Sequence, residues 1–147
     1  MISQAFLGGG CFWCLEGIFK ELEGVDKVVS GYMGGHIPNP SYEQVCLGNT
    51  GHAEVIKVNY HADVIDYQKL LRVFFSIHDP TTINRQGNDI GPQYRSVVFF
   101  ESEEEKSLIQ KVIHNLENKK LFANAIVTEI VPAATFYQAE GYYQDYL

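Results

Sequence analysis

The stretch Gly8–Cys14, with the sequence GGGCFWC, is the point around which the rest of the chain can be placed. A short run with strand character, Ser3–Leu7, comes before it, and apolar residues at helical spacing follow it as far as Leu22. The glycines between the two runs favour a tight turn, so the pattern predicts a strand, a glycine turn and a helix. Cys11 is then expected at the first turn of that helix.

A cysteine at the start of a helix is a candidate nucleophile. Unpaired backbone N–H groups and the positive end of the helix dipole favour a negative charge there. They can lower the pKa of a thiol well below its free value of about 8.5. A buried thiol without function is the ordinary alternative. The second cysteine, Cys14, and the bulky Phe12 and Trp13 favour function, so we expect a reactive thiol at Cys11 beside a small apolar pocket.

The composition narrows the class of protein. The chain has 147 residues, of which 46% are hydrophobic and 20% charged, and this predicts one globular domain over residues 1–147. The net charge is −7 and the lysines and arginines are scattered, which argues against nucleic acid or an anionic membrane as a partner. Neither a secretory leader pattern nor a long apolar run occurs, so we expect a cytoplasmic protein. We also expect a monomer. Three cysteines do not make a secreted disulfide framework.

The remaining patterns predict strands and helices separated by two long irregular regions. The expected elements are a strand within residues 24–35, a strand over 51–60, a helix over 66–78, a strand over 94–100, a helix over 102–120 and a strand over 125–131. This order predicts an α+β fold: a two-layer α/β sandwich with a ferredoxin-like split βαβ core, a mixed or antiparallel sheet, and helices mainly on one face. The irregular regions, 36–50 and 81–92, are long enough to be active-site loops.

Glu54 lies in the expected strand over residues 51–60, where it shares a face with Ile56 and Val58. A carboxylate among apolar neighbours is either paired or has a raised pKa, because burial disfavours its charged form. A face turned to water is the simpler alternative for a solitary strand glutamate. Three polar residues of the long loops are expected to reach toward the glycine turn: Tyr42, Asp89 and Tyr94.

Six motifs follow one another along most of the chain. They are Gly10–Trp13, Gly31–Gly35, Pro38–Tyr42, Gly51–Glu54, His78–Pro80, and Arg85–Asp89 continued by Gln93–Ser96. Together they resemble the peptide methionine sulfoxide reductases of the S-epimer class. The resemblance implies a single catalytic domain that reduces methionine-(S)-sulfoxide, peptide-bound or free, to methionine. It also implies repair of proteins damaged by oxidative stress, no bound cofactor, and thioredoxin or another dithiol as the external reductant.

The resemblance further implies a role for each candidate residue. Cys11 attacks the sulfoxide sulfur and becomes a sulfenic acid. Glu54, kept protonated in its apolar setting, gives a proton to the sulfoxide oxygen. Tyr42 and Tyr94 donate hydrogen bonds to the same oxygen, and Asp89 orients the site.

Two aromatic residues complete the expected site, and a second cysteine is expected to regenerate it. Phe12 and Trp13 are expected to hold the methyl group of the substrate. Relatives often carry a resolving cysteine in a C-terminal extension, and within these 147 residues the candidates are Cys14 and Cys46. We expect Cys14 to resolve the sulfenic acid, although an i,i+3 pair needs a distorted helix start to meet disulfide geometry. Cys46, between two apolar residues, is expected to be a packed core thiol.

Two other functions fit parts of the pattern. A general thiol–disulfide oxidoreductase also uses C-x-x-C at a helix start. The bulky residues between the two cysteines would obstruct a protein disulfide, however, and Glu54 would have no task. A zinc-binding structural module would use Cys11, Cys14, Cys46 and His52, but the spacing from Cys46 to His52 is not one of the common ligand pairs. We therefore expect no metal site.

Overall fold

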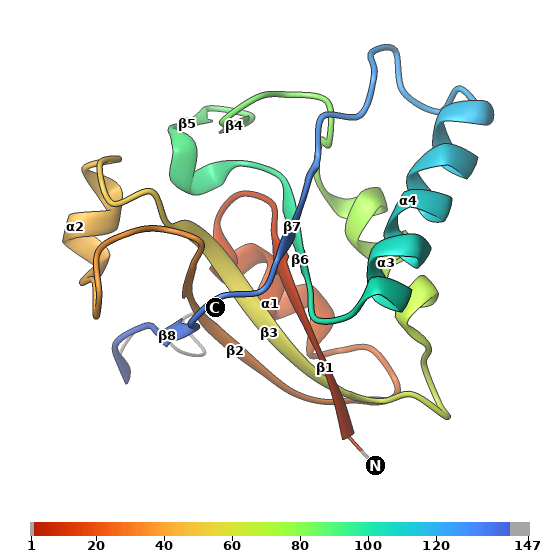
Figure 1. The fold of residues 1–147 in the computed structure, drawn as a ribbon, viewed down its shortest axis with the longest axis horizontal. Helices are drawn as coiled ribbons and strands as arrows, with labels where there is room; N and C mark the ends of the chain where they lie inside the picture. Colours follow the sequence, from red (N-terminus) through yellow and green to blue (C-terminus); the bar gives the residue numbers. More distant parts are fainter. Residues whose placement is uncertain (1, 142–147) are drawn as a thin grey trace.

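A six-stranded mixed sheet forms the centre of the computed structural model, which describes residues 2–141 (Figure 1). The strands lie in the order β7-β6-β1-β3-β2-β8. Their bounds are Ile2–Gly8 (β1), Val25–Met33 (β2), Ala53–His61 (β3), Val97–Phe100 (β6), Glu129–Pro132 (β7) and Tyr137–Gln138 (β8). A separate hairpin pairs β4 (Arg85–Gln86) with β5 (Asp89–Ile90).

The helices of residues 2–141 are α1 (Phe12–Phe19), α2 (Tyr42–Cys46), α3 (Tyr67–Ile77) and α4 (Glu103–Asn118), and a 3-10 turn, η1, spans Pro92–Tyr94. Side chains of α1, α3 and α4 share one core cluster with one face of the sheet. The sheet contributes Leu7, Ile56 and Val98 to it, and the helices contribute Phe12, Leu15, Phe19, Leu70, Phe74, Ile109 and Val112. None of these helices is long and apolar enough to span a membrane.

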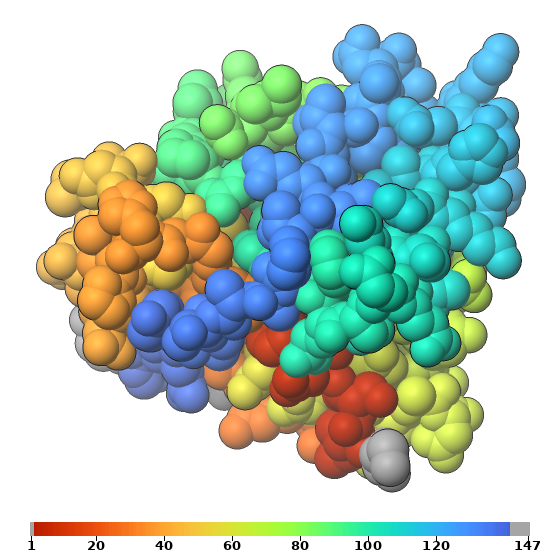
Figure 2. All heavy atoms as spheres, viewed as in Figure 1, coloured from red at the N-terminus to blue at the C-terminus, as the bar shows by residue number. Residues whose placement is uncertain are grey.

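The other face of the sheet carries a smaller cluster that includes Phe6, Val55 and Phe99. Val131 and Phe136 of the C-terminal segment pack against it. Figure 2 shows this segment, in blue, running across the surface of the molecule. The helices therefore lie mainly on one face, as predicted, and an extended segment covers the other.

The four central strands, β6-β1-β3-β2, confirm the predicted split βαβ core. β3 pairs antiparallel with both β1 and β2, so β1 and β2 run parallel with β3 between them. β6 pairs antiparallel with the outer edge of β1. β7 then adds in parallel to β6 and makes the sheet mixed. In this register Tyr32 of β2 lies opposite Glu54 of β3, near the end of the sheet from which α1 starts.

The loop over residues 36–50 differs from the prediction because it contains α2. Ser41 accepts a hydrogen bond from the backbone N–H of Gln44, and the Gln44 side chain accepts one from the backbone of Ser41. This reciprocal capping box stabilises a helix of only five residues.

The glycine turn leaves no room for a side chain at Gly9. A Cβ there would lie 2.8 Å from Cδ2 of His78 and 3.0 Å from Cε1 of Phe74, whereas a Cβ on Gly17 of α1 would meet nothing within 4 Å. We expect Gly9→Ala to lower the free energy of unfolding by about 1–3 kcal/mol through overpacking. Gly17→Ala should raise it by about 0.5–1 kcal/mol through helix propensity. Urea unfolding of both variants checks this, and a Gly9→Ala variant as stable as the parent would contradict it.

Candidate active site

Cys11 is the N-cap residue of α1, at the end of the glycine turn. Its backbone is extended, with φ −64° and ψ 122°, and its carbonyl accepts from the backbone N–H of Cys14 at 3.2 Å. Gly10 before it has φ 96°, a conformation that favours glycine. The strand, glycine turn and helix expected from the sequence are therefore confirmed, and the thiol lies where the sheet meets α1.

The pKa of the Cys11 thiol is raised to about 11, which corrects the expected lowering. Burial is the largest cause. The backbone N–H groups of Cys14 and Trp13 lower the pKa, and the nearby Glu54 carboxylate raises it further. The helix start thus acts in the expected direction, but loss of water outweighs it. At neutral pH Cys11 is a thiol, so its proton must move before it can attack.

Glu54 is buried beside the nucleophile, with only 1% of its surface exposed. The backbone N–H of Phe12, the residue after Cys11, donates to Oε1 of Glu54 at 3.1 Å. Burial raises the pKa of Glu54 to about 7; the hydrogen bond from Phe12 lowers it, and the charge of Asp89 raises it. The alternative of a solvent-facing carboxylate is excluded. No group among residues 2–141 donates to Oε2, the oxygen left for proton exchange.

Three aromatic rings form a wall next to Cys11. The ring centroid of Trp13 lies 5.5 Å from that of Phe12 and 5.5 Å from that of Tyr42. The rings of Trp13 and Tyr42 are stacked, with an angle of 29° between their planes. Phe12 is fully buried and Trp13 is half-buried. Since Tyr42 begins α2, the unpredicted short helix is what brings it to the start of α1.

The two phenols expected at the site are neutral donors. Burial raises the pKa of Tyr94 to about 12, with the charge of Glu54 as the next cause. Burial raises the pKa of Tyr42 as well, and the Glu54 charge adds to it. Asp89 is exposed in the β4–β5 hairpin, and its charge raises the pKa of Glu54. The structure therefore brings the loop residues Tyr42, Asp89 and Tyr94 into the electrostatic surroundings of Glu54.

Cys14 and Cys46 are both exposed free thiols. Cys14 lies in the first turn of α1, where the sequence places it. The expectation that Cys46 is a packed core thiol is wrong. The helical path of α2 turns Val45 into the core, and the two residues after it, Cys46 and Leu47, are exposed. Although the residue is exposed, the Cys46 thiol is hydrogen-bonded to the side chain of Tyr42, and partial loss of water around its sulfur raises its pKa.

The residues of the zinc alternative do not assemble into a ligand set. Within residues 2–141, no three His, Cys, Asp or Glu side chains are placed to hold a metal ion. Both ring nitrogens of His52 contact the backbone instead. Gly35 N–H donates to Nδ1 at 2.9 Å, and Nε2 lies 2.7 Å from the carbonyl oxygen of Ile37. His52 therefore joins the start of β3 to the loop before α2.

Gln86 contributes to the site in a way that sequence reasoning missed. Its side chain packs on Gly10, because a Cβ there would lie 3.0 Å from Cγ of Gln86. Its Oε1 accepts from the backbone N–H of Asp79 at 2.9 Å, and its Nε2 donates to the carbonyl of Asp79. The β4–β5 hairpin is thereby held over the glycine turn. A polar loop residue of this kind has no periodic pattern, and its place inside a motif was the one signal available.

The sequence model of the family described as Peptide methionine sulfoxide reductase matches residues 3–147. The chain belongs to this family. A peptide methionine sulfoxide reductase MsrA of Acinetobacter baumannii (strain AYE) is 53% identical over 145 residues, which cover 99% of this chain and 82% of the relative.

Two solved structures of a yeast protein are similar to the whole chain. Mxr1 from Saccharomyces cerevisiae in reduced form is 39% identical with a TM-score of 0.93, and the match covers 99% of this chain and 84% of that one. Mxr1 in complex with Trx2 is 28% identical with a TM-score of 0.69, and covers 99% and 85%.

Proposed function

We propose that this reductase works by attack of Cys11 on the sulfur of a methionine S-sulfoxide, with Glu54 moving the proton that the reaction needs. Thiol-dependent reduction of methionine sulfoxide is the activity of the family. The observation that carries the assignment of residues is the 3.1 Å hydrogen bond from Phe12 N–H to Glu54, which holds a buried carboxyl beside the nucleophile.

The pKa values of the two groups set the number of protons at the site. With Glu54 at about 7 and Cys11 at about 11, the pair carries one proton between these pH values. The Glu54 carboxylate accepts the proton of the Cys11 thiol, which makes a thiolate and a neutral acid. That acid then delivers the same proton to the sulfoxide oxygen. Glu54 thus acts first as base and then as acid.

The bond changes balance with this single proton. The Cys11 sulfur forms a bond to the sulfoxide sulfur as the oxygen takes the proton from Glu54. The resulting hydroxyl group transfers to the Cys11 sulfur, and the sulfur–sulfur bond breaks with its electron pair left on methionine. The products are a thioether and a sulfenic acid at Cys11, the first oxidised form of a thiol.

The other residues of the site act on the oxygen and on the methyl group. Tyr42 and Tyr94, as neutral phenols, donate hydrogen bonds to the oxygen while negative charge develops on it. Asp89 supports the proton on Glu54 through its charge. Phe12 and Trp13 hold the methyl group against the aromatic wall. Fixing the oxygen and the methyl group at the same time selects one epimer at sulfur.

Cys14 is the thiol that we propose for resolving the sulfenic acid. Its thiol attacks the Cys11 sulfur, water leaves, and a Cys11–Cys14 disulfide forms. Cys11 is the extended N-cap residue rather than part of the helix, which eases the approach of an i,i+3 pair. An external dithiol then reduces the disulfide by exchange. We propose a thioredoxin as this dithiol, because the similar Mxr1 forms a complex with Trx2.

Replacing Cys14 with Ser should therefore separate the two half-reactions. We expect one equivalent of methionine per enzyme to form at the parent rate, and turnover with thioredoxin to fall by at least about 10-fold, since no disulfide is offered for exchange. Mass spectrometry should find the disulfide in the parent and a sulfenic acid in the variant. Cys46→Ser is the matched control and should keep thioredoxin turnover. Loss of turnover in Cys46→Ser alone would transfer the resolving role to Cys46.

We propose that the enzyme works in the cytoplasm as a monomer. A monomer in the cytoplasm would repair methionine residues oxidised during stress, and reduce free methionine sulfoxide as well, with the dithiol as the source of electrons.

The experiment that tests the function is turnover of N-acetylmethionine S-sulfoxide with a dithiol, beside the R epimer as control. Insulin reduction without sulfoxide turnover would favour the general thiol–disulfide oxidoreductase instead.

A further inference from the structure

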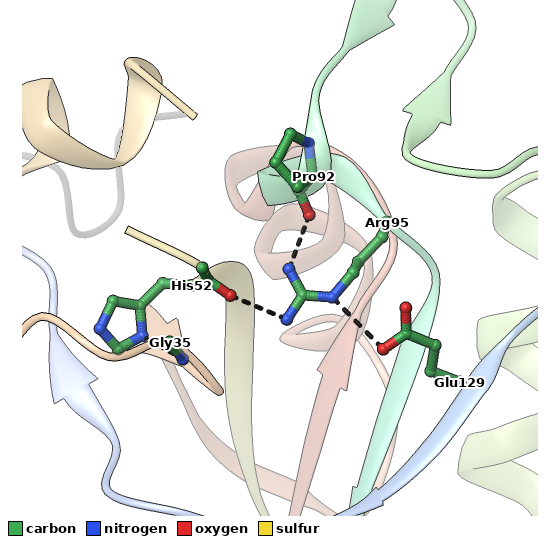
Figure 3. Close-up of polar contacts among 6 residues, drawn as sticks. Gly35, His52, Pro92, Arg95 and Glu129 are labelled. Carbon is green, nitrogen blue, oxygen red and sulfur yellow. Dashed lines mark hydrogen bonds and ion pairs between the residues drawn. The ribbon is translucent and has the colours of Figure 1, made fainter. Parts of the chain in front are cut away.

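Arg95 follows η1 directly and is the centre of the contacts in Figure 3. Its Nη1 donates to the carbonyl of Pro92 at 2.8 Å, and its Nη2 donates to the carbonyl of Gly51 at 3.0 Å. Its Nε lies 3.5 Å from Oε1 of Glu129 on β7, and its side chain is only 13% exposed. The guanidinium thus joins its own turn to the entry of β3 and to β7.

The two carbonyls belong to segments that carry residues of the active site. Gly51 precedes Glu54 by three residues at the entry of β3. Pro92 precedes Tyr94 by two residues in η1. One planar group therefore binds both the segment that leads to Glu54 and the turn that carries Tyr94.

The loop before α2 lies against both the guanidinium and the entry of β3. A Cβ on Gly34 would lie 3.3 Å from Nη2 of Arg95, so the guanidinium packs on the backbone of the loop before α2. His52 follows the carbonyl that Arg95 binds, and it contacts Gly35 and Ile37 of that same loop. Arg95 therefore lies where η1, the entry of β3 and the loop before α2 meet.

We propose that Arg95 is a positioning residue for the reduction, acting through Glu54 and Tyr94. The inference rests on the proposed function of those two residues. A guanidinium presents several N–H donors in a fixed planar fork and keeps its charge at all working pH values, so it can bind two carbonyls at once. A lysine ammonium has the charge without the fork. Because the reacting groups must be held within a fraction of an ångström, a small shift is expected to cost rate rather than binding.

The test compares Arg95→Lys and Arg95→Gln with Arg72→Gln, an exposed arginine of α3. We expect kcat for N-acetylmethionine S-sulfoxide to fall about 10-fold in Arg95→Lys and about 100-fold in Arg95→Gln, with KM changed less than about threefold. Arg72→Gln should keep the parent kcat. Rates are measured well below the unfolding transition, with the folded fraction checked by circular dichroism.

The pH profile separates positioning from loss of fold. In the parent, kcat/KM should fall as the pH drops through about 7, the pKa of Glu54; this fall is the acid limb of the profile. A displaced Glu54 gains water, so its pKa should fall and the acid limb should move to lower pH. A smaller folded fraction would instead lower the rate equally at every pH. Glu129→Gln keeps both carbonyl contacts, so it should stay within about twofold of the parent with an unmoved limb.

Two results are decisive against the role of Arg95. Folded Arg95→Gln with the parent kcat and the parent pH limb would overturn it, and if that variant does not fold, the same result in Arg95→Lys would do so. A parent enzyme that does not turn over the sulfoxide would instead overturn the proposed function. The two failures are distinguishable because the second is seen without any substitution.

Discussion

Cys11→Ser is expected to abolish turnover, leaving less than about one part in 10⁴ of the parent rate. A serine oxygen at this position cannot form the sulfur–sulfur bond or take up the sulfoxide oxygen as a sulfenic acid. The Glu54 carboxylate also cannot deprotonate a hydroxyl, whose pKa lies far above that of a thiol. The measurement is methionine formed from N-acetylmethionine S-sulfoxide with an excess of dithiothreitol.

Cys46→Ser provides the control for this loss. It removes an exposed thiol that is hydrogen-bonded to Tyr42 but leaves the proposed nucleophile in place. With a small dithiol that reduces Cys11 directly, we expect it to keep at least about half of the parent rate. Measurable turnover by Cys11→Ser, at a few per cent of the parent or more, would mean that another thiol is the nucleophile.

Glu54→Gln is expected to lower kcat by about 10²–10⁴-fold, the range for loss of general acid–base catalysis. Glutamine has the same shape, and its Oε1 can still accept the hydrogen bond from Phe12 N–H. It can neither take the proton of Cys11 nor deliver one to the oxygen. The exposed Glu104→Gln on α4 is the matched control and should leave kcat unchanged. A Glu54→Gln variant with the parent rate would remove the proton role and leave the nucleophile standing.

The parent enzyme should show a pH dependence of kcat/KM that Glu54→Gln lacks. Burial raises the pKa of Glu54 to about 7, so its carboxylate exists above that pH and is lost below it. The parent kcat/KM should therefore fall as the pH drops through about 7, since protonated Glu54 cannot accept the proton of Cys11. In Glu54→Gln this limb should be absent. A parent rate that falls as the pH rises through about 7 would instead mean that the reactive state holds both protons.

Local patterns in the sequence were sufficient for most of the fold. Apolar spacing and the glycine turn predicted the strand before Cys11 and the helix after it, and alternation predicted that Glu54 shares a face with Ile56 and Val58. The order of elements predicted the split βαβ core. These features follow from periods of two and of 3.6 residues, which chain segments carry without reference to their neighbours.

Predictions failed where the outcome depends on contacts between distant segments. Helix α2 is shorter than the length at which periodicity is visible, and it is stabilised by the capping box at Ser41 and by burial of Val45. Cys46 was misplaced for the same reason, because its exposure follows from the direction of that helix. The roles of Gln86 and Arg95 rest on contacts with Gly10 and Gly51, far away in the chain, which no local pattern encodes.

Sequence patterns alone predicted the order of the elements, the face that Glu54 shares with Ile56 and Val58 and, through the ordered motifs, the family. The burial of Glu54 and the protonation of the site depend on the folded structure. A helix start favours a thiolate, and from the sequence this is the one effect that can be seen. Folding buries the thiol next to a carboxylate, and the loss of water together with the like charge outweighs the helix amides. Such a balance depends on distances and solvent access that exist only after residues more than forty positions apart, such as Phe12 and Glu54, have met.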